Sequence, residues 1–169
     1  HYLSDPCFTI ALRARPNMDI PCQVGTCQHR NAMGATCGQP LDLKGKHARD
    51  CIWGGWIIKR HNAVVDEVCL WCEAQGAYVL KEVVLTHANE HQPEARIDLV
   101  AYLPNQSPIY IDVTIVSAQS KTALSRGSAD KNGVACELPA AAKRSKHPRI
   151  TVTPFVVEEH GRFGDEALT

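Results

Sequence analysis

Two neighbouring segments with strict apolar alternation constrain the fold of this chain more than any other feature. In both Ala95–Leu103 and Ile109–Val116, every second residue is aliphatic. Successive side chains of a β-strand point to opposite faces of a sheet, so each segment reads as a strand with one apolar face. The connection Pro104–Pro108 consists of turn-forming residues. We therefore expect an antiparallel hairpin.

The segments around this hairpin predict a mixed α/β core. After Gly55, apolar and histidine positions recur at helical spacing, and Gly76 is placed to end that helix. This stripe consists of Ile57, His61, Val64, Val65, Val68 and Cys72. A β-branched strand, Ala77–Leu85, should follow. Beyond the hairpin we expect a polar loop over 117–133, a helix from about Pro139 to Lys146 and a strand at Ile150–Val157. The predicted order is helix, three strands, helix, strand.

Three carboxylates in the predicted strands suggest a divalent cation site. Asp98 and Asp112 lie opposite the aliphatic rows of the two hairpin strands. Aspartate is disfavoured within strands and costly to half-bury, so two on adjacent strands require an explanation. Magnesium prefers one or two carboxylates plus water and phosphate oxygens, and Mn²⁺ is an alternative. Glu82 on the preceding strand is a candidate third ligand or water activator.

A positive charge beside such a site would stabilise the charge that develops during phosphodiester hydrolysis. Two residues after Asp112, on the same face of the strand, stands Thr114 rather than lysine. Lys143 and Lys146, three apart on the second predicted helix, share one face and are the candidate substitutes. A solvated helix face remains the alternative for these lysines.

The stretch before the core is rich in cysteine and histidine and poor in apolar residues. Its candidate ligands for a structural zinc ion are Cys27, Cys37, His47 and Cys51, with Cys22 or His29 as alternatives for the first. Structural zinc sites take four Cys or His ligands and supply folding energy to loop-rich segments. By contrast, Cys69 and Cys72 lie in the apolar helix, where we expect core residues rather than ligands or a redox pair. We expect His61, in the same helix, to be packed or hydrogen-bonded.

Composition fits a globular chain with three parts. We expect a helical segment at 1–21, a zinc knuckle at 22–54 and the α/β core at 55–169. The formal net charge is zero, but residues 119–151 carry seven Lys and Arg against two acidic residues, which could form a basic face. No apolar run reaches the ~18 residues that a membrane span needs, so we expect no membrane association. The chain begins at His1 rather than Met, which leaves a longer parent protein open.

Several short motifs, taken in order, match a known family. They are Cys37-Gly38, Leu41-Asp42, Gly45, His47-x3-Cys51, Arg60-His61-Asn62, Arg96-Ile97-Asp98, Asp112-Val113-Thr114-Ile115 and Lys143-x-x-Lys146. Together they resemble the restriction-like endonuclease domain of site-specific non-LTR retrotransposons, from about Phe8 to Gly161. The resemblance implies a PD-(D/E)XK nuclease fold preceded by a Cys-Cys-His-Cys zinc knuckle.

The resemblance also implies a function and partners. In that family the nuclease nicks double-stranded chromosomal DNA, and the exposed 3′ hydroxyl primes reverse transcription of the element's RNA. A reverse transcriptase and the element RNA would then be partners, in the nucleus. Asp98 and Asp112 match the family's metal-binding aspartates, and Lys143 and Lys146 match its helix-borne lysines.

The chain departs from the family pattern at three positions. Ile97 replaces the usual proline before the first aspartate, His147 replaces the usual aromatic after the second lysine, and Gly34 replaces the usual first knuckle cysteine. Two other functions therefore stay open. One is a host or phage nuclease or junction resolvase of the same superfamily. The other is a nucleic-acid-binding module that has lost cleavage and uses the knuckle and basic stretch for phosphate contacts.

Overall fold

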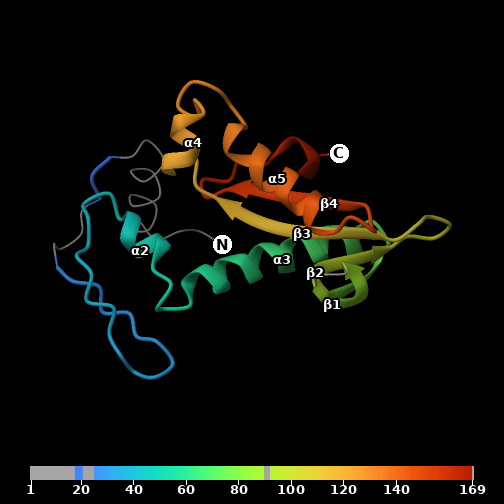
Figure 1. The fold of residues 1–169 in the computed structure, drawn as a ribbon, viewed down its shortest axis with the longest axis horizontal. Coiled ribbons are helices and arrows are strands. Elements are labelled where there is room, and N and C mark those ends of the chain that lie inside the picture. Colours follow the sequence, from blue (N-terminus) through green and yellow to red (C-terminus); the bar gives the residue numbers. More distant parts are fainter. Residues whose placement is uncertain (1–17, 21–24, 90–91, 169) are drawn as a thin grey trace. The chain divides into compact units, whose positions relative to one another are not determined.

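The computed structural model describes residues 18–20, 25–89 and 92–168, without the side chains of 86–95 (Figure 1). The chain divides into two compact units, His1–Arg60 and His61–Thr169. The division falls inside a helix, α3 (Trp56–Ala74), a little after the boundary expected at residue 54. Most of the helical segment expected at 1–21 lies outside the described residues, as does Cys22.

The first unit is held together by loops and one short helix, α2 (Lys46–Asp50). Two isolated antiparallel bridges, Thr26 with Pro40 and Arg30 with Thr36, fold residues 26–40 back on themselves. At the tip of this loop, the Asn31 side-chain oxygen accepts hydrogen bonds from the backbone N–H groups of Met33 and Ala35 at 3.0 Å. The unit thus has little regular secondary structure, as the sequence predicts.

The second unit is built on a four-stranded sheet in the order β1-β2-β3-β4. Its strands are β1 (Tyr78–Asn89), β2 (Gln92–Tyr102), β3 (Ile109–Val116) and β4 (Val152–Glu158). The first three pair antiparallel, and β4 pairs parallel to β3. Parallel neighbours need a long crossover, which here includes α4 (Lys121–Ser125) and α5 (Val134–Lys146). The predicted hairpin and the predicted order of helix and strands are confirmed.

Helix α3 covers one face of the sheet. Its buried residues pack in one cluster with side chains from β2, β3 and β4: Val65, Val68, Cys69, Leu99, Ile111, Val113 and Phe155. The helix ends before Gly76, which has a left-handed backbone with φ 82°. The core role expected for Cys69 is therefore confirmed, and half-buried Cys72 packs at the edge of the same cluster.

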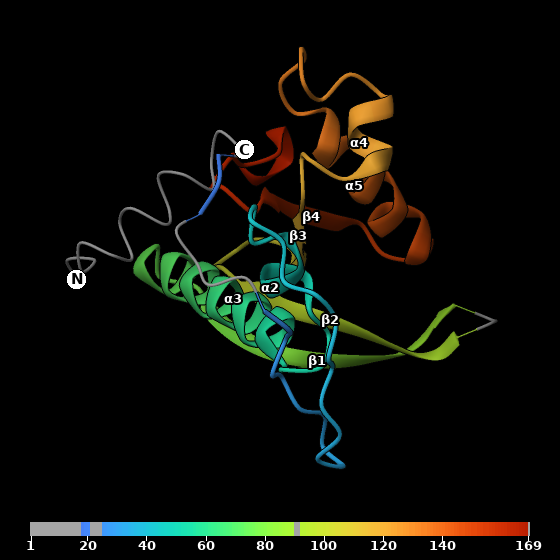
Figure 2. The ribbon, with the colours of Figure 1, turned by 90° about the vertical axis from the view of Figure 1, so that its left-hand side faces the viewer.

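Helix α5 covers the opposite face. Val156 follows Phe155 in β4, so the two side chains point to opposite sides of the sheet. Val156 packs against Cys136 and Ala140 of α5. Figures 1 and 2 show α3 and α5 on the two sides of the sheet. None of the helices among the described residues is long and apolar enough to cross a bilayer.

Two expectations about this crossover are wrong. The segment 117–133 is not only a loop, because α4 lies within it, with Ser120 as its N-cap. Helix α5 begins at Val134, after Gly133, rather than at Pro139. Proline inside a helix removes one backbone hydrogen bond and therefore reads as a helix start. Burial of Val134, Ala135 and Cys136 offsets that loss.

Candidate functional site

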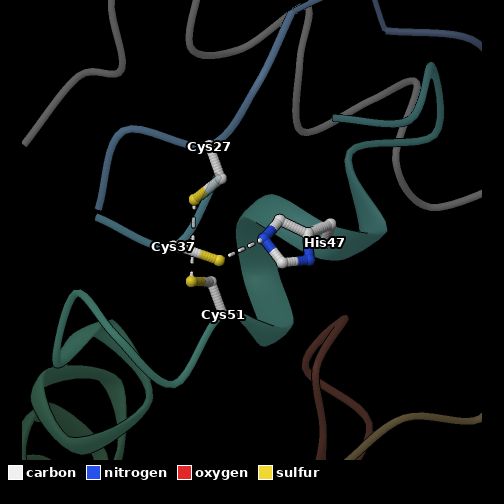
Figure 3. Close-up of side chains that lie close together, drawn as sticks. All are labelled: Cys27, Cys37, His47 and Cys51. Carbon is white, nitrogen blue, oxygen red and sulfur yellow. Dashed lines mark hydrogen bonds between the residues drawn. The ribbon is translucent and has the colours of Figure 1, made fainter. Parts of the chain in front are cut away.

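The first unit brings four metal-ligating side chains into one cluster. Cys27, Cys37, His47 and Cys51 each offer one ligand atom, and these atoms all lie within 4.8 Å of one another. In Figure 3 the side chains converge on a common point, with Cys27 Sγ 3.6 Å from Cys51 Sγ and Cys37 Sγ 3.5 Å from His47 Nε2. A tetrahedral zinc ion would set these separations at about 3.8 and 3.6 Å. The cluster therefore fits a metal such as zinc.

Backbone hydrogen bonds hold the segments that carry these ligands. Cys27 N–H donates to the Gln39 carbonyl, and Cys37 N–H donates to the His29 carbonyl, both at 2.8 Å. Residues 26–40 thus carry the first two ligands on paired stretches of chain. His47 lies in α2 and Cys51 directly follows it.

Asp42 fixes the start of α2. Its carboxylate accepts hydrogen bonds from Lys46 N–H at 3.0 Å and His47 N–H at 2.7 Å. Burial works against the ionised form of Asp42, but these backbone donors outweigh it and lower the pKa of the carboxyl below its usual value. These hydrogen bonds orient the turn that carries His47, and such contacts help to hold a metal ligand in its binding position.

The thiols of the cluster differ in acidity. Burial raises the pKa of the Cys27 thiol. At Cys51 burial also opposes ionisation, but hydrogen bonds from the His29 side chain and Trp53 backbone outweigh it and lower the pKa to about 6. The thiolate is the form that ligates metal, so the cluster offers a ready ligand at neutral pH. His29 thus contacts Cys51 and does not belong to the converging set of four.

The second unit brings Asp98 and Asp112 together on neighbouring strands. The β2–β3 register pairs Leu99 with Ile111, so the next opposed position joins the two aspartates. There the backbone ladder stops, and Asp98 Oδ2 instead accepts the N–H of Val113 at 2.7 Å. The aspartates therefore lie where β2 and β3 separate. The Asp98 side chain is 13% exposed and that of Asp112 only 4%.

The environment of Asp98 disfavours its ionised form. Burial is the main cause that raises the pKa of Asp98, and the adjacent Asp112 raises it further. The Val113 N–H and the His61 ring act in the opposite direction but do not cancel these effects. Two half-buried like charges in contact are disfavoured unless a cation or proton joins them.

Helix α5 supplies one of the two predicted lysines to this pair. Lys143 lies on the side of α5 that faces the sheet, and its Nζ is 2.6 Å from Asp112 Oδ1. Lys146 is exposed. The three-residue spacing therefore does not bring both lysines to Asp112.

Two histidines also contact the aspartates. His61 Nε2, from α3, lies 3.4 Å from Asp98 Oδ2, and His147 Nε2, directly after α5, lies 3.7 Å from Asp112 Oδ2. His147 is fully buried. His61 was expected to be packed or hydrogen-bonded, without a named partner. His147 stands four residues after Lys143, a spacing that places both on one helix face and could have identified it.

Glu82 does not join the aspartates as the alternation predicts. Its backbone has φ 55°, a conformation rare outside glycine, which interrupts the alternation of β1. Its carboxylate pairs with Arg96 at 3.0 Å, and the side chain is 49% exposed. Within the described part of the chain, only the Cys/His cluster gathers three or more Cys, His, Asp or Glu ligand atoms within 4.8 Å.

Taken together, the fold is a mixed α/β sheet with a helix on each face, accompanied by a Cys₃His cluster. A scan against protein-family models gives no match, and a search of curated proteins finds no similar sequence. Function must therefore be inferred from the chemistry of the two sites.

Proposed function

We propose that the second unit is a divalent-metal-dependent DNA endonuclease of the PD-(D/E)XK class, accompanied by a structural zinc knuckle in the first. The observation that carries the proposal is the contact of Lys143 with Asp112, beside Asp98, at the point where β2 and β3 separate. Two carboxylates and an ammonium group are the set that metal-assisted phosphodiester hydrolysis requires. The sheet order and the parallel β4 agree with this class.

Magnesium or manganese fits the residues present. Asp112 Oδ2 is buried and has no hydrogen-bond partner, which is unfavourable unless a cation or proton completes it. Asp98 and Asp112 would hold the ion. No third carboxylate joins them among the described residues, which leaves positions for water and phosphate oxygens. When bound, such an ion makes water a stronger nucleophile and neutralises charge on the leaving oxygen.

The chain's own residues would act around this ion. Lys143 is placed to donate to a phosphate oxygen or to the attacking water. His61 and the Val113 N–H orient Asp98 from two sides. Exposed Lys121, Lys131 and Lys146 would contact the backbone of double-stranded DNA. Following the resemblance, the nick would prime reverse transcription of a retrotransposon RNA in the nucleus.

A plasmid-nicking assay tests the proposal. With Mg²⁺ or Mn²⁺ the chain should convert supercoiled plasmid to the nicked circle, and Asp98→Ala or Asp112→Ala should abolish this while DNA affinity persists. Asp130→Ala is the matched control, because Asp130 is exposed in the loop after α4. Full activity in either site variant would contradict the assignment of the aspartates.

A further inference from the structure

His147 is a buried histidine whose ring has no hydrogen-bond partner. It is 0% exposed, and neither Nδ1 nor Nε2 has a hydrogen bond in the structure. The residue directly follows α5, whose last turn is held against the sheet by the Lys143–Asp112 contact. Buried polar atoms are nearly always satisfied, so an unpartnered imidazole calls for a ligand.

The atom that faces this ring is itself unsatisfied. Asp112 Oδ2 is buried without a hydrogen bond and lies 3.7 Å from His147 Nε2. That separation is too long for a hydrogen bond. Two ligands of one octahedral cation at about 2.1 Å lie about 3.0 Å apart in adjacent positions and about 4.2 Å apart in opposite ones. The observed separation lies between these two values, so a small movement of the His147 ring or of the Asp112 carboxylate would let both atoms bind one cation.

We infer that His147 Nε2 and Asp112 Oδ2 are direct ligands of the divalent cation, which gives the site a nitrogen donor. The inference rests on the proposed function and revises its ligand set, because His147 takes the place of Asp98 beside Asp112. The carboxylate of Asp98 does not lie within 4.8 Å of both atoms, so the ion is centred on Asp112 and His147. Imidazole favours transition metals over Mg²⁺, so the site should bind ions such as Mn²⁺ or Co²⁺ more tightly than an all-oxygen site would.

Pulsed electron paramagnetic resonance of Mn²⁺ tests this ligand directly. The whole chain is first loaded with zinc, so that the Cys/His cluster is filled, and Mn²⁺ is then added. We expect ¹⁴N hyperfine coupling from one imidazole on the bound Mn²⁺. His147→Gln should remove the coupling and weaken Mn²⁺ binding at least about tenfold. His61→Gln is the matched control, since His61 faces Asp98, and it should leave the coupling in place.

The possible failures are distinguishable. Mn²⁺ that binds in an Asp112-dependent way without ¹⁴N coupling would overturn the His147 ligand and leave the proposed function standing. A coupling that disappears in His61→Gln instead would also overturn it. If no Mn²⁺ binds outside the Cys/His cluster, the cation site and the proposed function fail together. The spectra of the wild type, Asp112→Ala and His61→Gln suffice for these outcomes even if His147→Gln does not fold.

Discussion

The two units of this chain hold their polar sites in opposite ways. In the first unit, the ligands converge fully, yet apolar support is scarce: among its described residues only Ile20, Cys27 and Cys51 are buried apolar or cysteine side chains. In the second unit, each of the three apolar clusters includes residues of the sheet. The carboxylates of Asp98 and Asp112 lie where β2 and β3 separate. We therefore expect the first unit to need a bound metal in order to fold, and the second unit to fold without one.

The difference has a physical cause. A loop-rich segment buries too little apolar surface to offset the entropy of ordering its chain, so metal ligation must supply that free energy. The packing of the sheet can offset the unfavourable free energy of holding the Asp98 and Asp112 carboxylates next to each other. The predictions below test whether the two sites are unequal in this way.

The largest effect should follow loss of a cluster ligand. Cys51→Ser should lower zinc content well below one ion per chain and unfold the first unit, because structural zinc in small domains contributes roughly 10–16 kcal/mol of folding free energy. Elemental analysis and amide hydrogen exchange over residues 25–60 measure both effects. Cys72→Ser is the matched control, since Cys72 lies outside the cluster. A Cys51→Ser protein that keeps its zinc and its protection would contradict the structural role.

The lysines of α5 should separate into two roles. Lys143→Ala should slow single-turnover nicking by about 10²-fold or more, because its ammonium contacts Asp112. Lys146→Ala should leave the chemical step intact, weaken DNA binding and reduce the slope of log affinity against log salt by about one unit. Equal nicking rates in the wild type and Lys143→Ala would remove this lysine from the site.

The smallest effect concerns the stability of the metal-free second unit. The raised pKa of Asp98, caused first by burial and then by Asp112, means that ionising it destabilises the fold. Stability should therefore fall as pH rises through the unfolded and then the folded pKa of this group. Asp98→Asn should stabilise the metal-free protein at neutral pH by on the order of 1 kcal/mol and remove this dependence. Denaturant melts at two pH values measure it, and a destabilised variant would count against mutual repulsion.

Much of this arrangement could be predicted from residue patterns. Alternation identified the hairpin, and with it the opposed positions of Asp98 and Asp112, because register follows from the apolar faces. The four ligands of the Cys/His cluster could be predicted because cysteines in a polar stretch lack an apolar core in which to pack, which favours metal ligation. Lys143 was one of two candidates, and only the orientation of α5 distinguishes it from Lys146.

The rest depends on geometry that patterns do not carry. The positive φ of Glu82 interrupts the alternation of β1, and the residues around Glu82 do not predict this conformation. The start of α5 was missed because Pro139 reads as a boundary, whereas tertiary packing of Val134 and Ala135 overrides it. His61 occupies a helical stripe of apolar residues, and its contact with Asp98 arises only when α3 packs on the sheet.

The most direct test of the unequal roles is a stepwise metal addition to one protein sample. The chain is loaded with a single zinc ion, freed of other divalent ions, and assayed for plasmid nicking before and after Mg²⁺ is added. We expect no nicking with zinc alone and nicking once Mg²⁺ is present, with the zinc content unchanged. Nicking by the zinc-only protein, or none with either Mg²⁺ or Mn²⁺, would contradict a structural metal in the first unit and a catalytic one in the second.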